Sequence, residues 1–346
     1  MRIVFAIPGD LNAASGGYAY DRALFAHAPA LGVELAHLAL PARFPFPTAQ
    51  DVETTLAHLR AHLRPGDSLL IDGLAFGALP AAAVAAVGAP IAALCHHPLF
   101  LETGLSASAA AALFASEKAA LSEARKVIVT SAHTAALVAR EFSVPEGKIA
   151  VAVPGVERGV RAPRRGEPPV LLTVGALIAR KGHDLLLDAL AGVVDLPWRL
   201  RICGSPEAAP EVARKLFARA GRADLAGRIE FLGEVSAPAL RPIFAGADIF
   251  VSASHYEGYG MALAEALSFG LPIVASSGGA AHETLPDAAA LKVATGNANA
   301  LRSALRLILT DRSRADAMAE AAWLAGQRLP DWRQTARNAI EAVLAA

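Results

Sequence analysis

Short aliphatic segments alternate with alanine- and leucine-rich segments along this chain of 346 residues. The aliphatic segments are almost continuously apolar, as strands that are buried on both faces must be. They are RIVFAI, SLLIDG, PIAALC, KVIVTS, IAVAVPG, VLLTVG, WRLRICG, RIEFLG, ADIFVSA and PIVAS. Segments with helical spacing lie between them, at 108–123, 132–142, 183–192, 208–222, 261–269 and 298–310. This order predicts parallel sheets covered by helices on both sides, the doubly wound α/β class.

One segment, ERGVRAPRRGEPP at 157–169, interrupts this alternation. It is rich in proline and arginine and has no hydrophobic periodicity, which is typical of a linker between domains. We therefore expect two Rossmann-like domains, at 1–160 and 161–328, that face each other across a cleft at the carboxyl ends of their strands. A last helix is predicted in 329–346, after Pro330.

The composition excludes some classes of protein. Lysine plus arginine and aspartate plus glutamate number 32 each, so the chain lacks the basic excess of a nucleic-acid-binding protein. Cys95 and Cys203 both follow aliphatic runs, which indicates buried thiols in a reducing compartment. No apolar run approaches the roughly 18 to 20 residues that a membrane span needs. These features predict a cytoplasmic protein.

The segment SASHYEGYGMALAEALSFGLPIVAS at 252–276 carries the clearest sign of chemistry. Glu257 precedes a glycine-rich turn, and Glu265 follows it on an alanine-rich helix. With Gly258 and Gly260 at the helix start, free backbone N–H groups are available for a phosphate. The two carboxylates can accept hydrogen bonds from hydroxyls. Phosphate and hydroxyls together describe a nucleotide sugar.

A second candidate is Lys181, in the sequence Arg180-Lys181-Gly182 between a predicted strand and a predicted helix. A nucleoside diphosphate gains negative charge as it leaves, and a fixed ammonium stabilises that charge mainly in the transition state. The helix start at Gly258–Met261 adds backbone donors. Such a site needs no metal ion, and no histidine or aspartate cluster in the sequence has the spacing of metal ligands.

These motifs resemble glycosyltransferase family four, the retaining nucleotide-sugar transferases of the GT-B fold. The resemblance rests on VGALIARKGHDLLLDAL, RICG, RIEFLGEV, ADIFVSASHYEGYGMALAEAL, GLPIVAS and SGGAAHETLPD in the second half. In the first half it rests on the pair Gly16-Gly17, on PIAALCHH and on VIVTSAHTAALVAREFSVPEGKIAVAVPGVE. It covers most of the chain in order, and it implies that the last helix packs back on the N-terminal domain.

The resemblance implies a role for each matching residue. Glu265 would hold the ribose hydroxyls, Glu257 the hydroxyls of the transferred sugar, and Lys181 the diphosphate. Gly17 would let the backbone approach the diphosphate across the cleft, and His96 would lie beside the reacting sugar. The implied catalytic residues are His96, Lys181 and Glu257, and the implied donor-binding residues are Gly17, Arg180, Lys181, Gly258, Tyr259, Gly260, Met261 and Glu265. Gly16, His97 and Glu283 are further candidates, for which a role in a turn or in packing is the alternative.

One position departs from the family pattern. Many members carry an arginine directly after the glycine that ends the strand before Lys181, where this chain has Ala176. Arg180 is close in sequence, and it could either replace the missing guanidinium or face solvent.

The resemblance implies a bacterial hexosyltransferase that uses no cofactor or metal and takes a sugar from a donor such as UDP-glucose or GDP-mannose. The acceptor would be a hydroxyl of a glycan or glycolipid in envelope polysaccharide or glycolipid assembly, with peripheral contact at the inner face of the membrane. A catalytically inactive nucleotide-sugar-binding protein, or an epimerase or phosphorylase of the same fold, stays open as an alternative. A nicotinamide-dependent dehydrogenase is disfavoured because the first strand lacks the Gly-x-Gly-x-x-Gly pattern. A glycoside hydrolase would pair carboxylates without a phosphate site.

Overall fold

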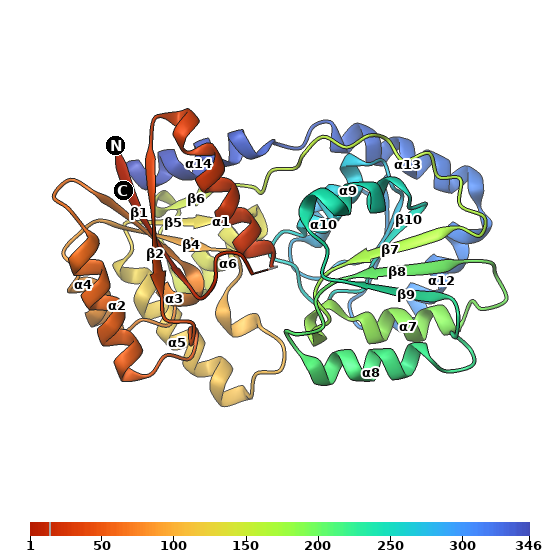
Figure 1. The fold of residues 1–346 in the computed structure, drawn as a ribbon, viewed down its shortest axis with the longest axis horizontal. Coiled ribbons are helices and arrows are strands. Elements are labelled where there is room, and N and C mark those ends of the chain that lie inside the picture. Colours follow the sequence, from red (N-terminus) through yellow and green to blue (C-terminus); the bar gives the residue numbers. More distant parts are fainter. Residues whose placement is uncertain (14) are drawn as a thin grey trace. The chain divides into compact units, whose positions relative to one another are not determined.

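The computed structural model describes residues 1–13 and 15–346, which form two compact units. Unit 1 comprises Met1–Gly155 and Pro330–Ala346, and unit 2 comprises Val156–Leu329. Within the described residues, each unit contains a six-stranded sheet in which all neighbouring strands are parallel. Helices lie on both faces of each sheet (Figure 1). The prediction of two doubly wound α/β domains is therefore confirmed.

In unit 1 the strands have the order β2-β1-β3-β4-β5-β6. These strands are β1 (Arg2–Pro8), β2 (Glu34–Leu40), β3 (Ser68–Asp72), β4 (Ile91–Cys95), β5 (Lys126–Val129) and β6 (Ile149–Val151). The α-helices are α1 (Gly16–His27), α2 (Ala49–His62), α3 (Gly73–Phe76), α4 (Ala81–Ala85), α5 (Ala107–Glu123), α6 (Ala132–Phe142) and α14 (Trp332–Leu344). Short 3-10 helices are η1 (Pro29–Leu31), η2 (Leu99–Leu101) and η3 (Glu146–Lys148).

In unit 2 the strands have the order β12-β11-β10-β7-β8-β9. These strands are β7 (Val170–Val174), β8 (Arg199–Cys203), β9 (Ile229–Gly233), β10 (Ile249–Ser252), β11 (Ile273–Ser276) and β12 (Ala290–Val293). The helices are η4 (Ala179–Lys181), α7 (His183–Ala191), α8 (Pro210–Ala220), α9 (Ala237–Ala245), α10 (Met261–Ser268), α11 (Ala281–Thr284), α12 (Ala298–Thr310) and α13 (Arg312–Gly326).

Strand β1 shows why both faces of the unit 1 sheet must be covered. Ile3 and Phe5 belong to a buried cluster with side chains of α1 and α14, whereas Val4 belongs to a second cluster with Leu59 of α2. Because successive side chains of a strand point to opposite faces, a strand apolar at every position needs a helical layer on each side. Unit 2 repeats this arrangement, with Ile249 and Phe250 of β10 in two different clusters.

The last helix, α14, packs within unit 1. Thr335 donates a hydrogen bond from Oγ1 to the carbonyl oxygen of Val153 at 2.8 Å, and the rings of Trp332 and Tyr20 pack in a T-shaped arrangement with 5.8 Å between their centroids. A Cβ atom at Gly155 would lie 2.4 Å from the backbone nitrogen of Trp332. The close approach of the two backbone segments therefore requires a glycine at this position.

The proline- and arginine-rich segment 157–169 contains no helix or strand and follows the surface of unit 2. Its contacts hold it there along its length. The backbone nitrogen of Ala162 donates to the carbonyl oxygen of Phe269 at 2.9 Å, and Arg158 donates to that of Gly326 at 3.1 Å. Near its end, Gly166 donates to Oδ1 of Asp248 at 3.1 Å. The segment predicted as a linker is thus held as part of unit 2, and the chain passes between the units at Gly155.

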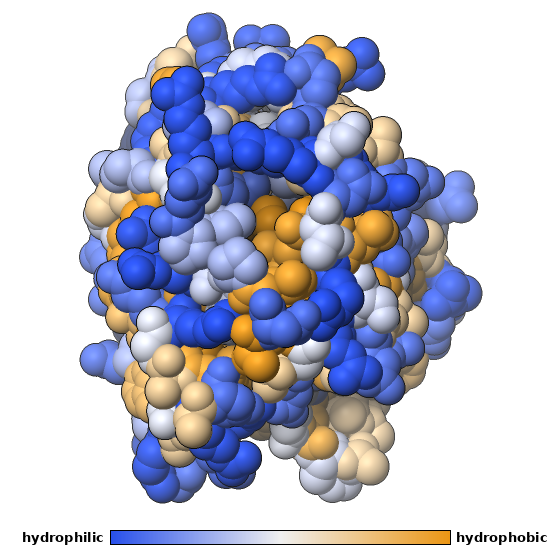
Figure 2. Space-filling view, turned by 90° about the vertical axis from the view of Figure 1, so that its right-hand side faces the viewer, coloured by the Kyte–Doolittle hydropathy of each residue, from blue (hydrophilic) through white to orange (hydrophobic). Residues whose placement is uncertain are grey.

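A pocket of about 500 Å³ lies at the amino-terminal edge of the unit 2 sheet. It is lined by Glu167, Pro168, Pro169, Pro197, Trp198, Arg199, Gly227 and Arg228. The Arg228 guanidinium donates hydrogen bonds to the carbonyl oxygens of Leu196 and Val194, both at 2.8 Å. This side chain therefore stabilises the neighbouring backbone. Figure 2 shows that this end of unit 2 is mainly hydrophilic, with a hydrophobic area near the centre. In doubly wound folds, ligands bind at the opposite, carboxyl-terminal edge.

A substitution at Gly326 can test how closely α13 packs on α10. A Cβ atom at Gly326 would lie 2.3 Å from the carbonyl oxygen of Leu267. We expect Gly326→Ala to lower the free energy of unfolding by about 1–3 kcal/mol, because backbone cannot move aside as a flexible side chain can. Helix propensity alone predicts the reverse, that the alanine raises the free energy of unfolding by about 1 kcal/mol. Thermal unfolding decides between them, with Gly147→Ala as the control because its Cβ would meet nothing within 4 Å.

Candidate functional site

Lys181 lies in a tight connection between β7 and α7. The connection forms the short helix η4, and Gly182 follows it with a φ of 60° in the left-handed region, which favours glycine. A Cβ atom at Gly182 would also lie 2.2 Å from the carbonyl oxygen of Ala253, just beyond β10. Since β7 and β10 are neighbours in the sheet, the turn brings Lys181 towards the segment that follows β10. The site therefore lies at the carboxyl-terminal edge of the unit 2 sheet, as predicted.

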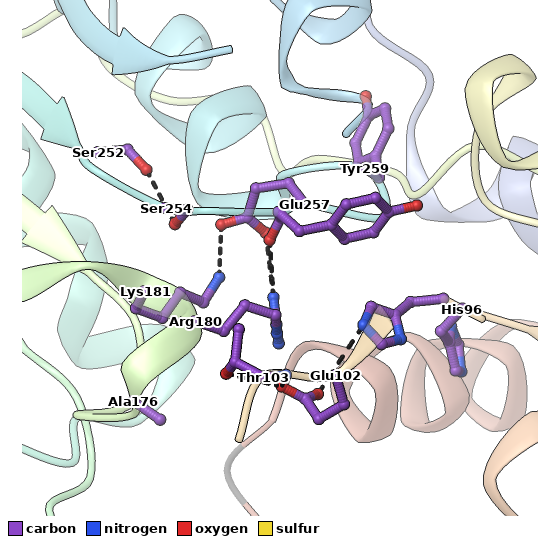
Figure 3. A network of polar contacts seen from close by, with 12 residues as sticks. His96, Glu102, Thr103, Ala176, Arg180, Lys181, Ser252, Ser254, Glu257 and Tyr259 are labelled. Atoms are coloured by element: carbon purple, nitrogen blue, oxygen red, sulfur yellow. Dashed lines mark hydrogen bonds and ion pairs between the residues drawn. The ribbon is translucent and has the colours of Figure 1, made fainter. Parts of the chain in front are cut away.

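Lys181 and Glu257 form an ion pair. Nζ of Lys181 donates to Oε1 of Glu257 at 2.7 Å, and the two side chains are 19% and 10% exposed (Figure 3). Burial raises the pKa of Glu257, but the nearby Lys181 and Arg180 outweigh burial and hold the pKa below its ordinary value. Glu257 is therefore an ionised, nearly buried carboxylate whose charge is balanced mainly by one ammonium.

Arg180 takes a different position from the one that the family pattern gives its arginine. Its Nη1 donates to the carbonyl oxygen of Tyr256 at 3.0 Å and lies 3.9 Å from Oε2 of Glu257. Its own carbonyl oxygen accepts a hydrogen bond from the backbone of His255 at 2.8 Å. The side chain is 17% exposed, so Arg180 points into the site beside Glu257, while Ala176 contributes no charge (Figure 3).

The backbone of Glu257 is held in place by the segment that contains the glycine pair Gly278-Gly279. Glu257 accepts a hydrogen bond at its carbonyl oxygen from Ala280 at 2.8 Å and forms a parallel bridge with Gly279. A Cβ atom at Gly279, whose φ is 62°, would lie 2.3 Å from that same oxygen. The contribution of Gly278-Gly279 to placing Glu257 was not predicted. Glu283, on α11 after this pair, is exposed.

Helix α10 begins in the glycine-rich turn. Gly260 precedes Met261, the first residue of the helix, with a φ of 95°, and no side chain among the described residues caps this end. Tyr259 is buried, and its carbonyl oxygen accepts a hydrogen bond from Oγ1 of Thr284 at 2.6 Å. Uncapped backbone N–H groups at a helix start suit an anion, and binding of a phosphate at Gly258 and its neighbours stays a prediction.

Glu265 lies in the second turn of α10 and is partly buried. Its carboxylate forms no hydrogen bond or ion pair with any residue that the structure describes. Burial raises its pKa to about 7, and the carboxylate of Glu157 adds to this rise while Arg241 opposes it. An acceptor group without a protein partner is available to a ligand hydroxyl, which is consistent with its predicted role.

In unit 1, His96 follows the end of β4 and is held by two carboxylates. Its Nε2 lies 3.1 Å from Oδ1 of Asp21 and 3.5 Å from Oδ2 of Asp72. Both carboxylates are buried, at 0% and 1% exposure. Burial lowers the pKa of His96, but the two carboxylates outweigh burial and raise the pKa to about 10. Burial raises the pKa of Asp21 to about 6, against the lowering effect of His96.

Gly16 and Gly17 are the first residues of α1, where Ser15 accepts a hydrogen bond from the backbone of Tyr18. A Cβ atom at Gly17 would lie 3.3 Å from Cδ2 of His96, so the histidine ring packs directly on this glycine. His97 lies beside Glu102, with 3.9 Å between Nε2 and Oε2. The structure thus brings Gly17 and His96 together within unit 1.

Asp21 and Asp72 were not among the site residues predicted from the sequence. Asp72 ends β3, the neighbour of β4, so its position at the carboxyl end of a strand was a usable signal. Asp21 follows Gly17 by one helical turn and lies on the same face of α1, a relation that appears only once the helix is known.

Asp21, Asp72 and His96 are also residue types that can ligate a metal ion. Among the described residues, the ligating atoms of Asp21, Asp72 and His96 all lie within 4.8 Å of one another. Sequence spacing did not reveal this set, because it is assembled from three separate elements. In the structure, Nε2 of His96 forms a hydrogen bond with Asp21 at 3.1 Å and an ion-pair contact with Asp72 at 3.5 Å. The arrangement is a hydrogen-bonded charge cluster.

Two family models match this chain. "Glycosyltransferase Family 4" matches residues 18–159, and "Glycosyl transferases group 1" matches residues 160–323. Among similar proteins is a GDP-mannose-dependent alpha-(1-6)-phosphatidylinositol monomannoside mannosyltransferase of Mycobacterium tuberculosis, 32% identical over 49% of this chain and 45% of the relative. A D-inositol 3-phosphate glycosyltransferase of Thermomonospora curvata is 26% identical over 63% of this chain and 56% of the relative. The chain thus spans about half the length of these curated relatives.

Solved structures share the fold over nearly the whole chain. Sucrose-phosphate synthase from Thermosynechococcus elongatus has a TM-score of 0.80 at 20% identity, covering 98% of this chain and 97% of the other. Alr3699/HepE of Anabaena, in complex with UDP-glucose, has a TM-score of 0.78 at 16% identity and covers 100% of both chains. These scores show a GT-B fold. In the part of the chain that the structure describes, no helix has the length and hydrophobicity that a bilayer crossing requires.

The raised pKa of Glu265 predicts a pH-dependent cost in stability. The unfolded chain ionises this carboxyl near pH 4.5, whereas the folded protein ionises it near pH 7. Stability therefore falls as pH rises between these values, because the folded state retains a proton that the unfolded state releases. Glu265→Gln abolishes this cost, so we expect its stability relative to wild type to grow by about 1 kcal/mol or more between pH 5 and pH 8.

Denaturant unfolding at both pH values measures this difference. Exposed Glu207 provides the matched control, since Glu207→Gln should change stability equally at both pH values. If Glu265→Gln and wild type depend on pH identically, Glu265 ionises normally in the folded protein.

Proposed function

Because the two family models together match most of this chain, it belongs to glycosyltransferase family 4, and we propose that it transfers a hexose from a nucleoside diphosphate sugar to a hydroxyl group. The transfer retains the anomeric configuration and uses no metal ion or cofactor. The acceptor is a glycan or glycolipid.

The observation that carries this proposal is the Lys181–Glu257 ion pair beside the uncapped start of α10. An ammonium and a set of backbone N–H groups at one edge of a sheet suit a diphosphate, which carries charge on several oxygens. A carboxylate in contact with the ammonium can receive sugar hydroxyls from the same ligand. Glu265, without a protein partner, is placed to receive the ribose hydroxyls.

The chemistry requires one bond to break and one to form on the same face of the sugar. The bond between the anomeric carbon and the diphosphate oxygen breaks, and the acceptor oxygen bonds to that carbon. The proton of the acceptor hydroxyl passes to the departing phosphate oxygen, so the nucleoside diphosphate itself serves as the base. Lys181 and the start of α10 stabilise the charge that develops on the diphosphate, which is electrostatic catalysis without a protein nucleophile.

The relatives support a choice of substrates to test. The mycobacterial relative is GDP-mannose-dependent and acts on phosphatidylinositol monomannoside, and the Anabaena structure contains UDP-glucose. We propose GDP-mannose or UDP-glucose as the donor and a glycolipid of the cell envelope as the acceptor. Gly16, Gly17, His96 and His97 of unit 1, with Tyr259, Met261 and Glu283 of unit 2, stay predicted contacts of these substrates.

Lys181→Ala tests the leaving-group role. We expect this variant to lose about 3 kcal/mol of transition-state stabilisation, a fall of roughly 10²-fold or more in turnover of the sugar nucleotide. The fold should persist because Arg180 stays 3.9 Å from Glu257 and still offsets its charge. Release of nucleoside diphosphate measures the rate, and Lys215→Ala, at an exposed position of α8, is the control. Turnover near the wild-type rate would remove Lys181 from the site.

A binding screen identifies the donor. A ligand that binds only the folded protein raises its unfolding temperature by mass action. We expect one nucleotide family among UDP, GDP and ADP, with its hexose conjugate, to stabilise the protein in the presence of a metal chelator. Stabilisation that appears only with added metal would contradict metal independence. Binding without turnover, in the presence of a glycolipid acceptor mixture, would indicate a nucleotide-sugar-binding protein instead of an enzyme.

A further inference from the structure

The two ends of the His96 ring have different surroundings. Nε2 lies between Oδ1 of Asp21 at 3.1 Å and Oδ2 of Asp72 at 3.5 Å. An ionised carboxylate can only accept a hydrogen bond, so Nε2 must carry a proton in this arrangement. The ring also packs in a T-shaped arrangement with the ring of Tyr20, with 5.1 Å between the ring centroids, and it packs on Gly17. The Nε2 end is therefore fixed in the interior of unit 1.

The other nitrogen, Nδ1, faces an accessible space. No hydrogen bond or ion pair between described residues involves Nδ1, and Nδ1 is not among their buried side-chain atoms that lack a hydrogen-bond partner, so it reaches the surface. The His96 side chain keeps 21% of its surface exposed, whereas Asp21 keeps none. A ligand can therefore approach His96 through Nδ1 but cannot reach the carboxylates behind it.

The charge on the ring decides what Nδ1 can do. A neutral ring with its proton on Nε2 has a lone pair on Nδ1 and can accept a proton, whereas an imidazolium donates from both nitrogens. Two carboxylates at one nitrogen favour the imidazolium, because a single positive charge then faces two negative charges in a buried setting. Asp21 also has Arg22 near it, but burial still raises the pKa of Asp21 to about 6, which leaves it ionised at neutral pH.

Four other titratable groups close to this cluster are neutral at pH 7. They are Tyr18 and Tyr20 of α1, Cys95 of β4 and Glu117 of α5, and burial is the main cause that raises the pKa of each. For Glu117 the pKa is raised to about 8, so this carboxyl is protonated at neutral pH. The charge of His96 therefore depends on Asp21 and Asp72.

We propose that Asp21 and Asp72 are positioning residues that hold His96 as an imidazolium, with Nδ1–H presented as a hydrogen-bond donor to an oxygen atom of the bound substrate. His96 is then a binding and charge-stabilising group for a phosphate or hydroxyl oxygen, and it does not act as a general base. This role rests on the proposed function, in which the departing phosphate oxygen takes the acceptor's proton and no protein base is needed. The proposal explains why a histidine at a strand end is backed by two buried acids.

The charge state can be measured without any activity assay. Ring-labelled histidine gives separate NMR signals for the imidazolium and the neutral ring, and His96→Gln identifies the signal of His96. We expect His96 to stay protonated at pH 8 in the wild-type protein. In Asp72→Asn, which keeps an oxygen to accept the hydrogen bond from Leu74, the midpoint should fall by about one pH unit or more. A wild-type His96 that loses its proton near pH 6.5 overturns the proposal.

A second variant and a control make the result specific. Asp21→Asn should lower the midpoint in the same direction, while Glu146→Gln, at an exposed position of unit 1, should leave it unchanged. If Asp72→Asn fails to fold, Asp21→Asn and Asp72→Glu still decide, since Asp72→Glu retains the second carboxylate and should keep His96 protonated. A midpoint that both Asn variants leave unchanged contradicts the proposal.

The pH profile of sugar-nucleotide turnover tests the role in transfer. Rates are compared as the ratio of variant to wild type at each pH between 6 and 10, because Glu265, which ionises near pH 7, affects all of these proteins alike. The ratio for Asp72→Asn should be close to one at pH 6 and fall as pH passes the lowered His96 midpoint, below the wild-type value of about 10, and Asp72→Glu should keep the ratio level. An equal loss at every pH would mean that Asp72 only supports the fold, which overturns the proposal. If the wild-type protein shows no turnover with any donor, the proposed function is wrong, and the NMR titration still decides the charge state.

Discussion

The parallel sheet is the constraint on which both units depend. Its strands are apolar on both faces, so each sheet must be covered by helices on both sides, and every connection must return to the same edge. Polar side chains are therefore gathered where the strands end. Lys181 and Glu257 follow the neighbouring strands β7 and β10, whereas Asp72 ends β3 and His96 follows β4, the neighbour of β3. The fold supplies these two charge clusters before any substrate is considered.

In each cluster a side chain with little solvent exposure keeps its charge because groups of opposite charge lie next to it. The retained charge is negative in unit 2 and positive in unit 1. In unit 2 a nearly buried carboxylate, Glu257, is kept ionised by Lys181 and Arg180. In unit 1 a partly buried imidazole is kept charged by Asp21 and Asp72. A buried charge without a partner is costly, and so a protein that needs fixed charge at its reaction site must build the partner into the scaffold. Both clusters are of the kind that electrostatic catalysis requires, because their dipoles and charges are oriented in advance.

The limits of sequence reasoning lie at the sheet edges and in tertiary contacts. Strands β2 and β12, which are outermost strands of their sheets, were not predicted from the sequence. An outermost strand has a strand neighbour on one side only, and β2 is exposed at several positions, so it lacks the continuous apolar run that identifies central strands. The helical segments named from the sequence also do not include α1, α2, α3, α4, α9, α11 and α13. In α9, prolines interrupt the helical pattern. Among the site residues, the pairing of Lys181 with Glu257 and the two acids behind His96 were not predicted.

The sequence by itself determined the class of fold, the segments that form its central strands, and the residues of the glycine-rich turn and the lysine loop, because these depend on local periodicity and spacing. Only the tertiary structure decided that Arg180 points into the site beside Glu257, and that His96 lies between Asp21 and Asp72. The physical reason is that a charge state depends on which groups lie within a few ångströms. Asp21, Asp72 and His96 become neighbours only when helix α1 packs on the sheet that contains β3 and β4.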